Sequence, residues 1–249
     1  MSPPNAGHTA RERARAELTR EIKEEARRQL AAVGADGLSL RAVARSLGMV
    51  SSALYRYFPS RDDLLTSLII DAYNALGDAV EAAGAAVAAA DGRARWVAVC
   101  RAVRSWALAN PHEYALIYGS PVPGYRAPEA TVAPAARLPL AFVRILRDAA
   151  TTGRPAAPGD TDAVPGGLPL DGPLAGQAAA LAAALAAALD EPGAPQLPPD
   201  ALVRAVIAWT QLFGMVSFEL FGQFVGSFEP AGALFAHAAA QSADFVGLR

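Results

Sequence analysis

The 249-residue sequence contains one cysteine, Cys100, and three histidines, so it is poor in the residues that form covalent cross-links and transition-metal sites. A single cysteine excludes an internal disulfide and is typical of a protein from a reducing compartment. Cys100 lies among apolar residues of a helical pattern, which favours a buried, inert thiol over a redox sensor. The scattered histidines do not form a zinc motif, and the sequence predicts no bound metal or cofactor.

Motifs of the common enzyme classes are also missing. The sequence has no glycine-rich phosphate loop, no Gly-x-Ser-x-Gly nucleophile motif and no pair of carboxylates at catalytic spacing. The N-terminus lacks the apolar segment of a signal peptide, and the longest uncharged run, 172–189, is mostly alanine and too weakly apolar for a membrane span. These absences predict a cytoplasmic protein without membrane association that is not an enzyme.

Helix-forming patterns rich in alanine fill most of the chain and predict an all-α fold. We expect a flexible tail over 1–9, a helix-turn-helix domain over 10–59 and a larger helical domain over 60–249. Residues 151–173 contain five prolines and five glycines and predict a mobile loop inside the larger domain. The expected helices of the larger domain cover 60–84, 93–110, 113–119, 129–150, 173–189, 200–227 and 230–246.

Two short helical patterns meet across one glycine in residues 39–58, SLRAVARSLGMVSSALYRYF. The first has an apolar stripe at i, i+3, i+4 and i+7, with Ser39 placed to cap its start. Gly48 follows this stripe, where a left-handed residue commonly ends a helix. These signals predict two helices joined by a tight turn.

The second helix of this pair is expected to begin near Ser51 and to have two different sides. At about 100° per residue, Leu54 and Phe58 share one side, while Ser52 and Arg56 point the opposite way. A buried side with an outward hydroxyl and guanidinium meets the demands of a helix in a DNA major groove. The alternative is an ordinary helical hairpin with a solvated polar face. Capping boxes at Thr9 and Ser60 favour the DNA-binding interpretation, because they predict helices on both sides of the pair.

The net charge of −2 is divided unevenly along the chain. Residues 1–70 contain 11 Arg and Lys against 8 Asp and Glu, whereas residues 71–249 contain 11 against 16. The positive excess therefore lies at the end that would meet phosphate. Because the excess is small, affinity would depend on a few placed contacts and on two copies of the chain.

The string LSLRAVARSLGMVSSALYRYFPSRDDLL resembles the N-terminal domain of TetR-family transcriptional regulators, and the similarity extends over residues 11–77. The resemblance implies a three-helix DNA-binding domain. By position, the residues expected to face base edges are Ser51, Ser52, Ala53 and Arg56. The residues expected to hold phosphates are Arg41, Tyr55, Tyr57 and Arg61. Because Ser52 and Ala53 are short, base readout would depend on Arg56 and on contacts of Ala53 with thymine methyl groups.

Two later strings, WALANPHEYALIYG and WTQLFGMVSFELFG, resemble the WHG-type C-terminal domain of some TetR-family regulators. The helix over 200–227 is apolar on nearly all sides, so it must be buried either in the core or against a second subunit. The resemblance implies the second route, with the last two helices pairing across a two-fold axis. The expected interface residues are Val216, Leu220, Phe224, Leu234 and Phe235. Such a homodimer would place its reading helices about 34–36 Å apart on a pseudo-palindromic operator in double-stranded DNA.

Aromatic residues of the larger domain are candidates for a pocket that binds a small apolar or aromatic effector. They are Trp106, Tyr114, Tyr118, Tyr125, Trp209 and Phe213. For each of them the alternative is a place in the core. The sequence thus predicts a homodimeric DNA-binding repressor that its effector releases from the operator. The second hypothesis is a helical interaction or small-molecule-binding protein whose DNA-binding domain is vestigial, and the third is an enzyme. Transcriptional activation in place of repression also stays open.

Overall fold

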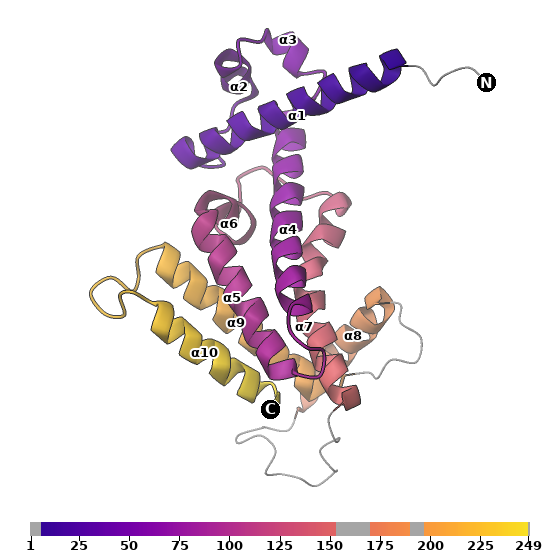
Figure 1. The fold of residues 1–249 in the computed structure, drawn as a ribbon, viewed down its shortest axis with the longest axis vertical. Helices are drawn as coiled ribbons and strands as arrows, with labels where there is room; N and C mark the ends of the chain where they lie inside the picture. Colours follow the sequence, from indigo (N-terminus) through magenta and orange to yellow (C-terminus); the bar gives the residue numbers. More distant parts are fainter. Residues whose placement is uncertain (1–5, 153–169, 190–196, 249) are drawn as a thin grey trace, which may run out of the picture. The chain divides into compact units, whose positions relative to one another are not determined.

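A computed structural model describes residues 6–152, 170–189 and 197–248. Every regular element in these ranges is a helix, and the predicted all-α fold is confirmed (Figure 1). The described residues form two compact units. The first unit contains residues 6–74 and 110–135, and the second contains the described residues of 75–109, 136–152, 170–189 and 197–248. Most of the loop predicted over 151–173 lies outside the described residues.

The first unit begins with the long helix α1 (Ala6–Val33). This helix starts before the predicted capping residue Thr9, so the part of the predicted tail that is described, from residue 6, is helical. It ends where Gly34 takes a left-handed φ of 71°. α2 (Leu40–Ser46) and α3 (Ser51–Leu54) follow, and α4 (Arg61–Ala85) then begins at a capping box. In this box Ser60 Oγ accepts from Asp63 N across 3.1 Å, as the sequence predicted.

The core of the first unit is made by one stripe from each of its first helices. Apolar side chains of α1, α2, α3 and the start of α4 are at most 7% exposed, and they include Ile22, Ala26, Val43, Leu54, Leu65 and Leu68. Half-buried residues of α6 (Pro111–Tyr118) pack against this cluster, among them Leu116 and Ile117. The three-helix arrangement is therefore held by burial of apolar area, which stabilises by about 25 cal/mol for each Å².

The first unit is larger than the DNA-binding domain that we predicted to end at residue 59. Leu64, Leu65, Leu68 and Ile69 of α4 belong to its core, and 110–135 also packs with it. The predicted boundary followed the break at Pro59, which ends one helix and starts the next. A proline that separates two helices does not indicate which hydrophobic core the second helix joins.

The second unit contains α5 (Gly92–Ala109), most of α7 (Val132–Thr152), α8 (Gly172–Leu189), α9 (Pro199–Leu220) and α10 (Gly232–Phe245). A 3-10 turn (Glu129–Thr131) precedes α7. Trp96 of α5 links three of these helices: its ring lies 4.5 Å from that of Phe142, and its Nε1 donates to Ser242 Oγ across 2.9 Å. Arg104 of α5 donates to both carboxylate oxygens of Glu219 near the end of α9, at 2.7 and 2.5 Å.

Helix α9 differs from its prediction in length and in burial. It ends at Leu220 rather than Ser227, and turns with left-handed glycines at Gly222 and Gly226 follow. Only one side is buried in the chain, and the large apolar side chains that stay exposed near it are Val206, Ile207, Phe218, Phe221, Val225 and Phe228. By length and mean hydropathy (1.5) α9 could cross a membrane, a test that core helices also meet, and 22% of that window is buried.

Candidate nucleic-acid interface

The turn between α2 and α3 is fixed by local backbone chemistry. Ser39 Oγ accepts from Ala42 N across 3.4 Å at the start of α2. At the other end Gly48 takes a φ of 65°, and Met49 N donates to Ala44 O across 2.8 Å. A Cβ at Gly48 would meet nothing within 4 Å, so the backbone conformation, and not space, requires glycine there. The predicted cap and turn are both confirmed.

The segment after this turn presents its polar side chains outward. α3 is one turn long and continues through turns closed by bonds such as Phe58 N to Leu54 O at 3.1 Å. Leu54 is fully buried and Phe58 is 7% exposed, whereas Ser52 and Arg56 are exposed. The predicted orientation is therefore confirmed. Of the other residues expected at bases, Ser51 and Ala53 are half-buried.

The four residues expected at phosphates lie in different environments. Arg41 is exposed in the first turn of α2, and Tyr55 is 42% exposed directly after α3. Tyr57 is half-buried against the core of the first unit. Arg61 differs from its prediction, because its guanidinium donates to Ala35 O at 2.7 Å and Leu38 O at 3.3 Å. These bonds hold the chain between α1 and α2 to the start of α4, and we give Arg61 no role at DNA.

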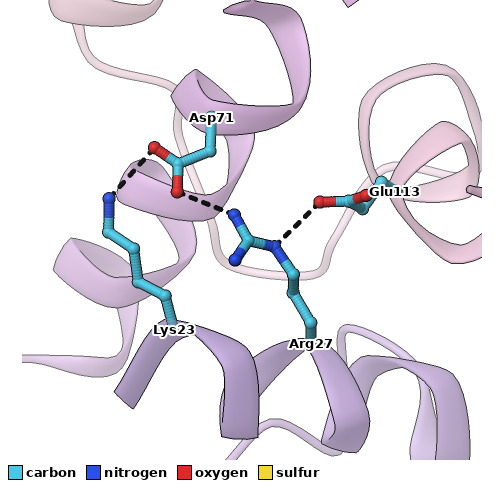
Figure 2. A network of polar contacts seen from close by, with 4 residues as sticks. All are labelled: Lys23, Arg27, Asp71 and Glu113. Carbon is cyan, nitrogen blue, oxygen red and sulfur yellow. Dashed lines mark hydrogen bonds and ion pairs between the residues drawn. The ribbon is translucent and has the colours of Figure 1, made fainter. Parts of the chain in front are cut away.

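An ion-pair network that sequence analysis did not find joins α1 to α4 and α6 (Figure 2). Asp71 of α4 accepts from Lys23 Nζ at 3.0 Å and from Arg27 Nη2 at 2.8 Å. Arg27 Nε also donates to Glu113 Oε1 of α6 at 2.9 Å. The partners are 44 to 86 residues apart in sequence, so no local pattern could have indicated them.

Comparisons with known proteins match both parts of the chain. Residues 22–68 match the family profile described as "Bacterial regulatory proteins, tetR family", and residues 96–241 match "Tetracyclin repressor-like, C-terminal domain". The HTH-type transcriptional regulators Rv1816 of Mycobacterium tuberculosis and Mb1846 of Mycobacterium bovis are each 39% identical to the chain over 212 residues. These residues cover 85% of this chain and 84% of theirs.

The chain belongs to the TetR family of transcriptional regulators.

Two solved structures share this fold. The crystal structure of SCO4313 is 36% identical to this regulator, with a TM-score of 0.68 over 93% of this chain and 97% of that one. A Rhodococcus sp. RHA1 protein of unknown function is 25% identical, with a TM-score of 0.63 over 92% and 93%. The match over residues 96–241 also confirms the predicted resemblance to a WHG-type C-terminal domain.

Three of the predicted pocket residues of the regulator are tyrosines of the first unit. Tyr114 is fully buried, with its ring 5.4 Å from that of Tyr118, and the ring of Tyr118 lies 6.1 Å from Tyr73. Burial, followed by the neighbouring tyrosines, raises the pKa of Tyr118, so its hydroxyl stays protonated. Tyr125 bonds Thr66 Oγ1 across 2.8 Å. These contacts are those of packed core aromatics, and a role in effector binding stays a prediction.

The other three pocket candidates belong to the second unit. Trp106 of α5 is 9% exposed. Trp209 and Phe213 of α9 make an edge-to-face pair at 5.7 Å. Trp209 Nε1 is buried, and no acceptor for it lies among the described residues. An unpaired buried donor is uncommon in a folded protein, and it marks this ring as a place where a ligand acceptor could bind.

The predicted dimer residues of the regulator divide into two groups. Leu220, Phe224 and Leu234 are half-buried and keep surface for a partner. Val216 is fully buried and Phe235 is 3% exposed, because both face the core of the second unit. These two side chains have no surface to offer a second subunit, so the expectation for them is withdrawn.

Proposed function

We propose that this TetR-family regulator is a homodimeric repressor that binds a pseudo-palindromic operator and is released by a small apolar effector. The DNA-binding role is supported by one short segment that has two side chains buried on one side and two exposed on the other. Leu54 and Phe58 are buried in the core, while Ser52 and Arg56 are exposed beside them. A segment fixed by its apolar side can present its polar side to base edges without rearranging.

Within a half-site, the exposed residues suit different parts of the DNA. Arg56 can bind guanine O6 and N7 in a bidentate manner, and Ala53 can contact a thymine methyl group. Arg41 and Tyr55 are exposed on either side of the turn and suit phosphate oxygens. The half-buried Tyr57 would offer its hydroxyl in the same way.

The outward side of α9 supports a second subunit of the same chain. At about 100° per residue, Val206, Ile207, Gly214 and Phe218 lie on one side, opposite the buried Ala208 and Leu212. A Cβ at Gly214 would meet nothing within 4 Å, so the neighbouring surface leaves room for a closely approaching helix. Exposed apolar area of this kind, on a helix that ends at the half-buried Leu220 and is followed by the half-buried Phe224, is typical of a subunit interface.

The effector site is proposed around Trp209 and Phe213. The paired rings supply apolar surface, and Trp209 Nε1 supplies one donor that lacks an acceptor among the described residues. An apolar or aromatic molecule with one acceptor atom fits this combination. Release from DNA requires that the effector bind more tightly to one conformation of the dimer. In that conformation the spacing of the two DNA-binding domains no longer matches the spacing of the half-sites. We place the regulator in the cytoplasm, where it has access to its DNA.

The proposal is tested by comparing Arg56→Ala with Arg41→Ala on two DNA duplexes. One duplex is a site that the full-length protein selects from a random-sequence library, and the other is its scrambled sequence. Arg56→Ala should weaken binding to the selected site by ~1–3 kcal/mol and leave scrambled DNA nearly unaffected. Arg41→Ala should weaken binding to both alike. Equal losses on both duplexes for Arg56→Ala would remove its assigned role, and no binding by the wild type at low salt would favour a vestigial DNA-binding domain.

A further inference from the structure

The basic residues of α1 fall into two groups that differ in their partners. From residue 20 onward, every one has an acidic partner: Arg20 with Glu17 and Glu24, Lys23 with Asp71, Arg27 with Asp71 and Glu113, and Arg28 with Glu25. Arg11, Arg13 and Arg15 are exposed, and none of them makes an ion pair within the part of the chain that the structure describes. Within the described residues, the guanidinium groups of these three arginines are therefore not paired with a carboxylate.

Two of these three arginines lie on the side of α1 that faces the helix-turn-helix. At about 100° per residue, Arg11 and Arg15 share a strip about 60° wide with Leu18 and Ile22, which pack in the core. Gln29 falls on the same strip, and its Oε1 accepts from the backbone N of Ser39 at the start of α2 across 3.4 Å. Arg13 points to roughly the opposite side.

Arg15 is also held directly against the reading segment. Its guanidinium lies 5.4 Å from the centroid of the Tyr57 ring, within the range of a cation–π contact. Tyr57 follows the exposed Arg56, and its ring packs on the core of the first unit. A guanidinium stacked on a ring keeps its N–H donors available at its edge, so the contact positions Arg15 without using its hydrogen bonds.

We propose that Arg11 and Arg15 bind phosphates flanking the half-site read by α3, and thus extend the DNA contact beyond the helix-turn-helix. The inference rests on the proposed DNA-binding function. Both residues precede the segment that matches the N-terminal family profile, which begins at residue 22. Arg11 and Arg15 lie one turn apart on one side of α1 and have no acidic partner among the residues that the structure describes, so they suit two phosphate oxygens of one DNA strand.

The salt dependence of binding tests this inference, because each phosphate contact contributes about −0.9 to the slope of log K against log salt. The double variant Arg11→Ala/Arg15→Ala is compared with the wild type on the selected duplex and on its scrambled version. The slope should fall in magnitude by about 1.8 for each bound subunit, on both duplexes. Between 50 and 200 mM salt, the wild type should therefore lose about 12-fold more affinity per bound subunit than the double variant.

Two further variants separate a local contact from a change in overall charge. Arg13→Ala removes the same charge from the same helix on its other side and should keep the wild-type slope. Arg15→Lys keeps the charge and should restore most of the slope when it is paired with an intact Arg11. Removing base pairs from the outer ends of the selected duplex should abolish the difference between the double variant and the wild type.

The outcomes distinguish this inference from the function on which it rests. A double variant with the same slope as Arg13→Ala, while the wild type still binds its selected site, would overturn the phosphate contacts alone. A wild type that binds neither duplex in a salt-dependent way would overturn the proposed function and the inference with it. Thermal unfolding of each variant shows that the fold is intact: Arg13→Ala should match the wild type, and loss of the exposed Arg15–Tyr57 contact should lower the unfolding temperature only slightly.

Discussion

Arg27 of α1 donates from Nε to Oε1 of Glu113 in α6 across 2.9 Å, although 86 residues separate the two in sequence. The same guanidinium donates from Nη2 to Asp71 of α4 at 2.8 Å. One side chain thus fixes three helices of the first unit relative to one another. Its guanidinium side chain is 34% exposed, so solvent screening reduces the energy of each ion pair.

Replacing Arg27 by alanine should lower the free energy of unfolding by about 1–2 kcal/mol, because two charged hydrogen bonds are lost and two carboxylates remain half-buried. Urea unfolding followed by circular dichroism measures the change. Arg13→Ala is the control, since Arg13 is exposed and makes no ion pair in the described residues. Equal stability of the two variants would show that the network contributes nothing measurable.

Arg61→Ala should act on stability rather than on phosphate binding. The variant loses bonds to the carbonyls of Ala35 and Leu38, which should cost about 1–2 kcal/mol of the free energy of unfolding. At a temperature where the variant is folded, its affinity for scrambled DNA should stay within about twofold of the wild type. A uniform loss of affinity with unchanged stability would instead restore Arg61 as a phosphate contact.

The thiol of Cys100 should not react with iodoacetamide at pH 8 in the folded protein. It is 1% exposed, and burial raises its pKa to about 12. Because the folded pKa lies above the ordinary value of about 8.5, the resulting stability is present below pH 8.5 and is lost as pH rises toward 12. Mass spectrometry with and without denaturant measures labelling, and rapid labelling of the native protein would contradict this placement.

Phe218→Glu should convert the regulator from dimer to monomer. Phe218 is 53% exposed in the single chain, so a charge there adds no burial cost to the monomer but would be buried in the proposed interface. Sedimentation velocity measures the oligomeric state. The matched control is Leu174→Glu on α8, where the replaced side chain is 46% exposed. A wild type that sediments as a monomer, or identical behaviour of both variants, would refute the proposed interface.

Trp209→Phe should raise the free energy of unfolding by about 1 kcal/mol without effector, since it removes a buried donor that has no acceptor among the described residues. The same variant should bind an effector more weakly. Thermal shift with a panel of apolar and aromatic compounds measures both effects. Trp106→Phe provides the comparison, because Trp106 has a polar or ring partner in the structure and should lose rather than gain stability.

Sequence patterns predicted the features of this fold that depend on neighbouring residues. The cap at Ser39, the left-handed Gly48 and the capping box at Ser60 all follow from backbone chemistry within a few positions. The outward direction of Ser52 and Arg56 follows from helical periodicity once Leu54 is buried. Caps, turn glycines and helical periodicity depend on residues close in sequence, so they can be predicted from a single sequence.

Features that depend on distant partners were not predicted. The bonds of Arg61 to two backbone carbonyls and the Lys23–Asp71 pair leave no periodic signal in the sequence. Periodicity also could not show which apolar side of α9 is buried within the subunit and which stays exposed. Val216 was expected at a partner and lies in the core, while Phe218, two residues later, is exposed.

The brevity of α3, with four helical residues, limits how much sequence one subunit can distinguish. A single turn can bring only a few side chains to base edges, each worth about 1–3 kcal/mol of discrimination. Recognition by one copy would therefore tolerate many related half-sites in a genome. Selectivity must then arise from the fixed distance between the recognition helices of two subunits. Inserting or deleting a base pair at the centre of the operator should therefore reduce affinity more than most single base substitutions do.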